Sequence, residues 1–115
     1  MQYLLLIYEN EQITHGLAPA ELGEVMAGYD AFTRSVKASG QLVNANRLHD
    51  VAKATTVRIR DGKVQITDGP FAETREQLGG YYLLDAKNLD EATALAAKIP
   101  AARSGSIEIR PIWEP

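Results

Sequence analysis

The chain has 115 residues, of which 45% are hydrophobic and 23% are charged, a composition typical of one globular domain. The formal net charge is -3 and the basic residues form no run, so we expect no nucleic-acid partner, because such partners bind clusters of Lys and Arg. No cysteine is present, which excludes disulfides, thiolate nucleophiles and cysteine-ligated zinc.

The first predicted element is a strand at residues 2–8, where large apolar residues follow one another without polar alternation. Such a strand needs cover on both faces. The stretch has no basic segment or small-residue cleavage site before or after it, and it is too short to cross a bilayer. We therefore interpret it as a buried strand of a cytoplasmic protein without a membrane partner.

A long helix is predicted to begin at Pro19, a residue that suits the first helical turn, and to stop at Gly40. Apolar residues recur there at three- and four-residue spacing, which indicates one buried helical face over about five turns. Asp30 and Arg34 are placed for an ion pair on the other side. The expected inner face consists of Leu22, Val25, Met26, Tyr29, Phe32, Thr33 and Val36.

Residues 41–48 are typical of a strand with polar interruptions, and a hairpin follows. The strands 56–60 and 63–66 flank Asp61-Gly62, a pair that favours a type I′ turn because both positions need positive φ. This register places Val57, Ile59, Val64 and Ile66 on one apolar face. Arg58, Arg60, Lys63 and Gln65 take the other face, which must be in contact with water.

After residue 80, three more elements are predicted. Residues 81–86 form a strand that is apolar on both faces. A helix begins near Asn88, as expected for an Asx-x-x-Glu start, and ends at Pro100. Its inner face is Leu89, Ala92, Leu95, Ala96 and Ile99. Residues 106–110 alternate as a last strand.

Without the hairpin, the order of elements is β-α-β-β-α-β, which predicts a ferredoxin-like α+β fold with an antiparallel sheet. Both helices must then cover one face of that sheet. The other face carries tyrosines and leucines from strands 2–8 and 80–86. Because that apolar patch is larger than monomers usually expose, we predict a homodimer packed through these faces.

The stretch between the hairpin and the strand at 81–86 holds the densest mixture of glycine, proline and charge. Pro70 moves Gly69 out of the α region, so Asp68 stands at a sharp turn. Its carboxylate either caps a short helix at Phe71–Leu78 or points into a cavity as a base or ligand acceptor. Gly79-Gly80 indicates a close backbone approach or a bulge.

Other polar residues have two interpretations each. Glu73, with Glu76, is either part of a solvated face or an acid–base group. His49, flanked by Arg47 and Asp50, is either an exposed loop residue or a proton-transfer group. Tyr29 either packs in the core or offers its hydroxyl to a ligand. The site hypothesis makes Asp68 and His49 catalytic and Tyr29, Arg47, Glu73 and Tyr81 ligand-binding. Neither metal nor cofactor is expected, since His15 and His49 share no ligand spacing.

The run from Thr67 to Tyr82, Thr-Asp-Gly-Pro-Phe-Ala-Glu-Thr-Arg-Glu-Gln-Leu-Gly-Gly-Tyr-Tyr, resembles the signature of the DGPF branch of the YCII-related family. The likeness extends to residues 54–58, 90–92 and 107–111, and so to essentially the whole chain, as one domain over residues 1–115. The resemblance implies a ferredoxin-like protomer and a homodimer of the dimeric α/β-barrel type.

The functional implications of the resemblance are broader. YCII relatives include small enzymes that act on ring-derived intermediates of aromatic degradation, with a helix histidine as the catalytic group. That position falls near Tyr29, and this chain has no histidine between residues 16 and 48. One hypothesis is an enzyme of lyase or isomerase type, or a ligand-binding protein, with one small-molecule pocket per protomer. The alternative is a non-catalytic regulatory dimer that binds another protein, since the DGPF branch is associated with sigma-factor regulation.

Overall fold

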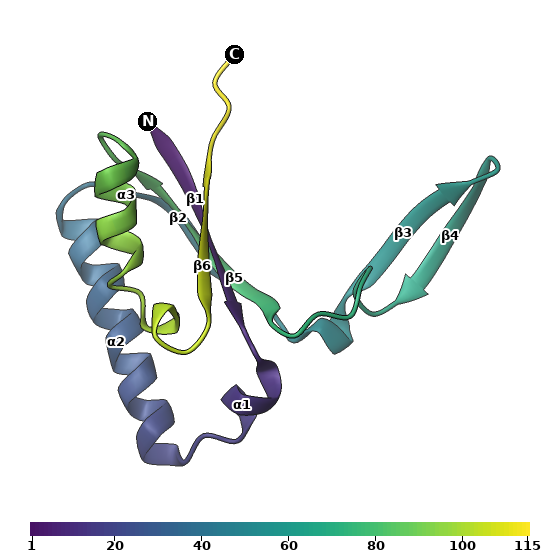
Figure 1. The fold of residues 1–115 in the computed structure, drawn as a ribbon, viewed down its shortest axis with the longest axis horizontal. Coiled ribbons are helices and arrows are strands. Elements are labelled where there is room, and N and C mark those ends of the chain that lie inside the picture. The colour runs from purple at the N-terminus through teal and green to yellow at the C-terminus, as the bar shows by residue number, and fades with distance from the viewer.

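The computed structural model describes residues 1–115 as a mixed α+β fold (Figure 1). The main sheet is antiparallel, with strand order β2-β5-β1-β6. Two helices, α2 and α3, cover one face of it. This arrangement is consistent with the predicted ferredoxin-like fold. The elements are β1 (Gln2–Glu9), β2 (Leu42–Arg47), β5 (Gln77–Asp85), β6 (Ser106–Pro111), α2 (Pro19–Ala38) and α3 (Leu89–Ala96).

Three short elements lie in segments for which the sequence predicted no structure. They are the helix α1 (Glu11–His15) and the 3-10 turns η1 (Val51–Lys53) and η2 (Pro100–Ala102). The helix α1 begins directly after β1, because the Asn10 side chain accepts hydrogen bonds from the backbone N–H groups of Gln12 and Ile13. A side-chain acceptor at this position satisfies amides that have no partner within the helix.

The core lies between the helices and the sheet. Side chains alternate between the two faces of a strand, so Tyr3, Leu5 and Ile7 of β1 point toward the helices and are buried. The buried hydrophobic residues are Tyr3, Leu5, Ile7, Phe32, Val36, Tyr82, Leu84, Ala86, Ala92, Ala96, Ile99 and Ala101. Of the predicted inner face of α2, only Phe32 and Val36 are fully buried.

The opposite face of the sheet, which we call the open sheet face, has no helix over it (Figure 1). Its centre is apolar and consists of Leu4, Leu6, Tyr8, Tyr81 and Leu83, all partly exposed. The strand register places Leu4 beside Leu83 and Leu6 beside Tyr81. Polar residues of the edge strands, among them Asn46 and Glu108, border this centre.

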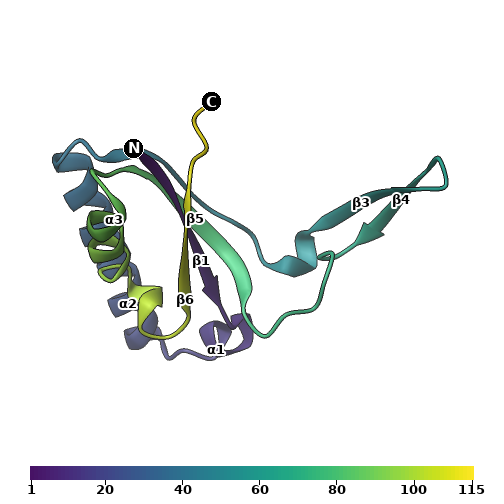
Figure 2. The ribbon, with the colours of Figure 1, turned by 45° about the horizontal axis from the view of Figure 1, so that its top comes forward.

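Strands β3 (Thr55–Arg60) and β4 (Lys63–Asp68) form a separate two-stranded sheet, residues 55–68, which we call the arm. It projects away from the body of the molecule (Figure 2). Val57 pairs with Ile66 and Ile59 with Val64, and the turn residue Asp61 has a φ of 53°. The expected register is present, and the apolar face of the arm is exposed.

The helix predicted at Phe71–Leu78 is wrong, and Asp68 therefore caps no helix. Residues 71–76 form bends and irregular backbone, and Gln77 already belongs to β5. The Thr74 hydroxyl donates to the carbonyl of Glu76 (2.5 Å) and the Gln77 side chain donates to the carbonyl of Thr74 (2.6 Å). Pairing of Gln77 with Glu9 of β1 then extends the sheet, so tertiary pairing overrides the local helix propensity of this segment.

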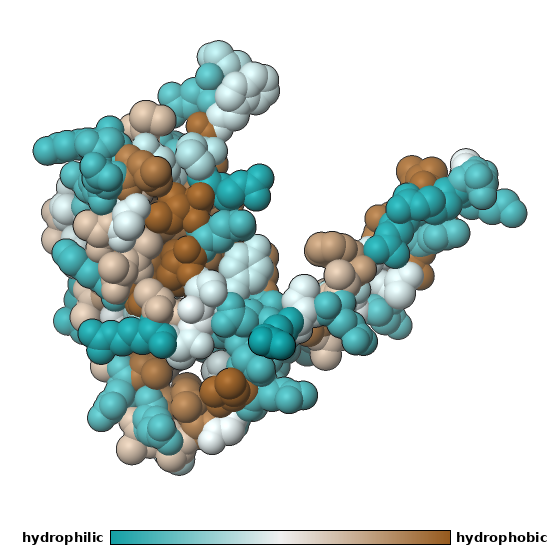
Figure 3. Space-filling view, in the orientation of Figure 1, coloured by the Kyte–Doolittle hydropathy of each residue, from teal (hydrophilic) through white to brown (hydrophobic).

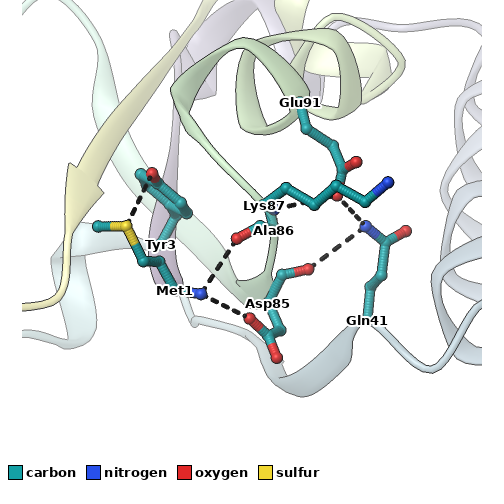
Figure 4. Close-up of polar contacts among 7 residues, drawn as sticks. All are labelled: Met1, Tyr3, Gln41, Asp85, Ala86, Lys87 and Glu91. Carbon is teal, nitrogen blue, oxygen red and sulfur yellow. Dashed lines mark hydrogen bonds and ion pairs between the residues drawn. The ribbon is translucent and has the colours of Figure 1, made fainter.

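A polar cluster holds the end of the sheet where β1 starts and β5 finishes (Figure 4). The Met1 amino group donates to Asp85 Oδ1 (3.0 Å) and to the carbonyl of Ala86 (3.1 Å). Gln41 Nε2 donates to Glu91 Oε1 (2.9 Å). These bonds join β1, β5, the start of β2 and α3 at this end of the sheet. Glu9 lies at the other end, where β1 finishes.

Candidate functional site

A cavity of about 280 Å³ lies at that other end, between α2 and the sheet. We call it the α2 cavity. Of its 15 lining residues, nine are hydrophobic, a proportion typical of sites for small organic molecules. The lining consists of Ile7, Glu9, Thr14, Leu17, Leu22, Val25, Met26, Tyr29, Ala45, Asn46, Arg47, Gly79, Gly80, Tyr81 and Tyr82.

The cavity exists because the apolar face of α2 continues beyond the part of the sheet it packs against. Phe32 and Val36, in the C-terminal half of the helix, are buried in the core. In the N-terminal half, Leu22 and Met26 stay 40% and 45% exposed although they belong to the same helical face. These side chains form an apolar wall rather than core packing.

Two tyrosines provide hydroxyl groups at the cavity. Tyr29 donates a hydrogen bond to Glu9 Oε1 at 3.4 Å. Burial, and then the negative charge of Glu9, raise the pKa of Tyr29 above its usual range, so its hydroxyl stays protonated, as a donor to Glu9, even at alkaline pH. Tyr82 shares a 2.8 Å hydrogen bond with Thr33 and meets Phe32 edge to face, with ring centroids 5.0 Å apart.

The cavity contains one carboxylate and one guanidinium. Glu9 stands at the end of β1, and its Oε2 also accepts a long hydrogen bond of 3.5 Å from Ser104. Arg47 stands at the end of β2, is exposed, and takes part in none of the four ion pairs of the structure. A guanidinium with free donors is suited to bind a carboxylate or another planar anion.

The glycine pair forms part of the wall, and both predicted reasons for it are present. A Cβ on Gly80 would lie 2.8 Å from the carbonyl oxygen of Asn46, so β5 approaches β2 closely there. Opposite Gly79, the register between β1 and β5 shifts between Ile7 and Tyr8, which is a local bulge. The bulge and the close approach shape the wall of the cavity beside Arg47.

The structure brings together only part of the residue set proposed from the sequence. Tyr29, Arg47 and Tyr81 line the α2 cavity. The Tyr81 hydroxyl, however, accepts hydrogen bonds from Asn46 (2.7 Å) and Asn44 (3.4 Å), residues that strand alternation places on the open sheet face.

The other three residues of that set lie elsewhere. Asp68 is exposed at the end of β4, and Glu73 is exposed in the segment after the arm. His49 is exposed and lines a second, wider hollow together with Pro70, Phe71 and Leu78. Neither Asp68, Glu73 nor His49 lines the α2 cavity.

Sequence reasoning missed Glu9, the α1 residue Thr14 and the loop residue Leu17. Glu9 ends a predicted core strand and precedes the helix-capping Asn10, and polar residues at strand ends often belong to sites.

Two hydrogen bonds fix the position of α1. Glu11 Oε1 accepts from the backbone N–H of Val51 (3.0 Å), and Gln77 Oε1 accepts from that of Glu11 (2.9 Å). These bonds hold the α1 segment, and thereby Thr14, against the sheet.

No group of three or more His, Asp or Glu side chains is arranged to hold a metal ion. None of the helices combines the length and the apolar character that crossing a membrane requires.

Comparison with known proteins gives one family. A family model described as the YCII-related domain matches residues 1–115. The chain is also 39% identical over 114 residues to the "Uncharacterized protein R00369" of Rhizobium meliloti (strain 1021), an alignment that covers 97% of this chain and 92% of the relative.

Proposed function

The chain belongs to the YCII-related family, and we propose that it binds a small organic molecule in the α2 cavity, one molecule per protomer. The observation that carries this proposal is the convergence of Glu9, Tyr29 and Arg47 on one mostly apolar cavity. Such a combination of an apolar wall with a few polar groups is the usual composition of a small-molecule site. The Asp68-Gly69-Pro70-Phe71 run supports placement in the DGPF branch.

The chemistry of the lining favours a compact apolar anion. Leu22, Val25 and Met26 offer contact area to a ring or a short hydrocarbon skeleton. Arg47 offers unpaired donors for a carboxylate. The volume of about 280 Å³ lies just below the range for sites of drug-sized ligands, about 300–1,000 Å³, which favours a small ligand.

Glu9 and Tyr29 are the side chains that we propose for any proton transfer in the α2 cavity. Glu9 is its only carboxylate, and the Tyr29 hydroxyl donates a hydrogen bond to it. Tyr29 lies near the position at which the family resemblance implies a helix histidine, so a Glu–Tyr pair occupies the corresponding region. We propose this pair, rather than Asp68 or His49, as the reactive centre if turnover occurs.

The proposed assembly is a homodimer of the dimeric α/β-barrel type, with the open sheet faces packed together. Leu4, Leu6 and Leu83 form its centre and would otherwise remain in contact with water. Burial of such apolar area contributes about 25 cal/mol per Å². In this arrangement the α2 cavities lie on the outer layers, and each protomer keeps its own site.

Ligand binding can be tested with benzoate and its neutral isostere benzamide, followed by amide chemical shifts in two-dimensional NMR. We expect benzoate to shift the amide signals of Gly79, Gly80 and Tyr82, and Arg47→Gln to weaken benzoate binding about tenfold, which corresponds to about 1.4 kcal/mol. Benzamide binding should respond much less to Arg47→Gln, because the amide carries no charge.

Arg60→Gln is the matched control, since Arg60 lies on the arm and outside the cavity. If neither compound shifts the cavity amides at millimolar concentration, or if both variants weaken benzoate equally, the assignment of this cavity is wrong.

A further inference from the structure

The arm carries a strip of four β-branched apolar residues with no partner in the chain. Val57, Ile59, Val64 and Ile66 are 61%, 64%, 64% and 69% exposed. They pair across the two strands on one face of the arm. An isolated two-stranded hairpin is marginally stable in water, and an exposed apolar strip of this kind marks an interaction surface.

Hydrogen bonds close the base of the arm and join its two strands to the segments that flank them. The backbone N–H of Gly69 donates to the carbonyl of Ala54 (2.7 Å), and the Thr56 hydroxyl donates to the carbonyl of Gly69 (2.8 Å). Arg58 donates to the carbonyl of Phe71 at 3.1 Å. Preorganisation of this sort lowers the entropy cost of docking onto a folded partner.

The arm points away from the main sheet and leaves space for a second folded domain beside the open sheet face. The helices lie on one side of the sheet and the arm extends on the other, the side of the open sheet face (Figures 1 and 2). Figure 3 shows a wide notch between the body and the arm, with apolar atoms along the arm. A molecule seated on the open sheet face would therefore lie beside the arm.

The area of the open sheet face alone is small for a stable dimer. Four strands spaced about 4.8 Å apart, with about seven residues each at 3.3 Å per residue, cover about 450 Å². A standard interface buries about 800 Å² per partner. One arm face of two strands covers about 200 Å². In a two-fold dimer each copy buries the face of its own arm and the surface on which the partner's arm packs, so the arms add about 400 Å² per copy. This addition brings the buried area to the standard size.

We propose that the apolar strip of the arm packs against a second copy of this chain, the copy that occupies the open sheet face. This inference rests on the proposed sheet-face dimer. It adds that the arm of each copy packs against the other copy. Arg58, Arg60 and Lys63 lie on the other face of the arm and remain in water.

The test is the dissociation constant of the dimer, measured by sedimentation velocity on the full chain. Val57→Thr with Ile66→Thr replaces one cross-strand pair of the strip and keeps β-branched side chains, so the hairpin itself is preserved. We expect at least a tenfold weaker dimer. A second variant replaces residues 58–65 by Asn-Gly, which shortens the arm and retains the Val57–Ile66 pair; it should weaken the dimer further.

The matched control is Arg60→Thr with Lys63→Thr, a cross-strand pair on the other face, and it should dimerise like the unsubstituted chain. Dimers of unchanged affinity in both the strip and the shortened-arm variants would overturn the inference while leaving the sheet-face dimer intact. A monomeric unsubstituted chain would overturn both. Binding to vesicles of phosphatidylcholine and phosphatidylserine that is lost in the shortened-arm variant, with no change in dimer affinity, would assign the strip to a membrane surface and also overturn it.

Discussion

The hydroxyl of Tyr29 lies 3.4 Å from Oε1 of Glu9, and the two side chains form a polar contact within an otherwise mostly apolar cavity. Tyr29 comes from the middle of α2 and Glu9 from the last position of β1. The contact thus joins the helical layer to the sheet layer at the end of the sheet where the two separate.

Tyr29→Phe should change the alkaline stability profile. Burial first, and Glu9 second, raise the pKa of Tyr29, so its contribution to stability is fully present below the unfolded pKa of about 10. Above that pH the unfolded chain releases a proton that the folded chain retains, and stability falls as pH rises. Urea unfolding from neutral pH upward should show a shallower fall for Tyr29→Phe. Tyr81→Phe, the same chemical change outside the Glu9 contact, serves as control.

Glu9→Gln separates the two causes of this shift. Removing the negative charge should lower the pKa of Tyr29, yet burial is the larger cause, so the pKa should stay above its ordinary value. Phenolate absorbance during an alkaline titration, compared with that of Tyr29→Phe, measures the change. A return of the Tyr29 pKa to the ordinary value would show that the charge, and not burial, dominates.

Gly80→Ala and Gly79→Ala should differ sharply although the positions are adjacent. A Cβ at residue 80 would meet the backbone carbonyl oxygen of Asn46 at 2.8 Å, whereas a Cβ at residue 79 meets nothing within 4 Å. We expect Gly80→Ala to lower the free energy of unfolding by about 1–3 kcal/mol and Gly79→Ala to change it by less than about 0.5 kcal/mol. Equal effects in urea unfolding would contradict the close approach of β2 and β5.

The same substitution should have opposite signs at Gly69 and Gly23. Gly69 has a φ of 98°, a conformation that costs an L-residue about 1–2 kcal/mol, so Gly69→Ala should destabilise. Gly23 lies inside α2 with open space around it, and Gly23→Ala should stabilise by about 0.5–1 kcal/mol. Thermal unfolding of both variants checks the pair, and a neutral Gly69→Ala would exclude the positive φ.

Leu6→Glu tests the proposed interface between the open sheet faces. Leu6 lies between Tyr81 and Glu108 of the neighbouring strands, and a carboxylate in the centre of the dimer interface would be buried without a partner. We expect a monomer at micromolar concentration in sedimentation velocity, with an unchanged circular dichroism spectrum. Ser35→Glu, on the exposed side of α2, should leave the assembly unaltered. A Leu6→Glu protein that sediments like the parent would rule out this face.

The parts of the fold that the sequence predicts well are those determined by neighbours along the chain. The helix from Pro19 and the Asp61-Gly62 turn appear as expected. Residues 71–76 show the limit of such reasoning, because their composition permits a helix but Gln77 pairs with Glu9 of a distant strand. The expectation that Asp68 caps a helix failed with that helix.

The candidate site was harder to predict, because the cavity depends on where the packing of α2 against the main sheet ends. Leu22 and Met26 have the spacing of core residues, and nothing in the sequence indicates that they line a cavity instead. Glu9 reaches Tyr29 only through the packing of α2 on β1. The glycine and proline content of the run around Asp68 indicates an unusual backbone, and Gly69 has a positive φ. The carboxylates of Asp68 and Glu73, however, lie outside the α2 cavity.

The arm also has a consequence for the newly synthesised chain. Its contacts join sequence neighbours, so it forms within microseconds, whereas the sheet needs pairing of its first strand with its last, as between Ile7 and Ile107, which is slow. A marginally stable apolar hairpin with unpaired edges therefore forms transiently before the body is complete, and such edges are where aggregation begins. Arg58, Arg60 and Lys63 then act as gatekeepers during biogenesis, so neutralising these charges should reduce the yield of refolding at high concentration.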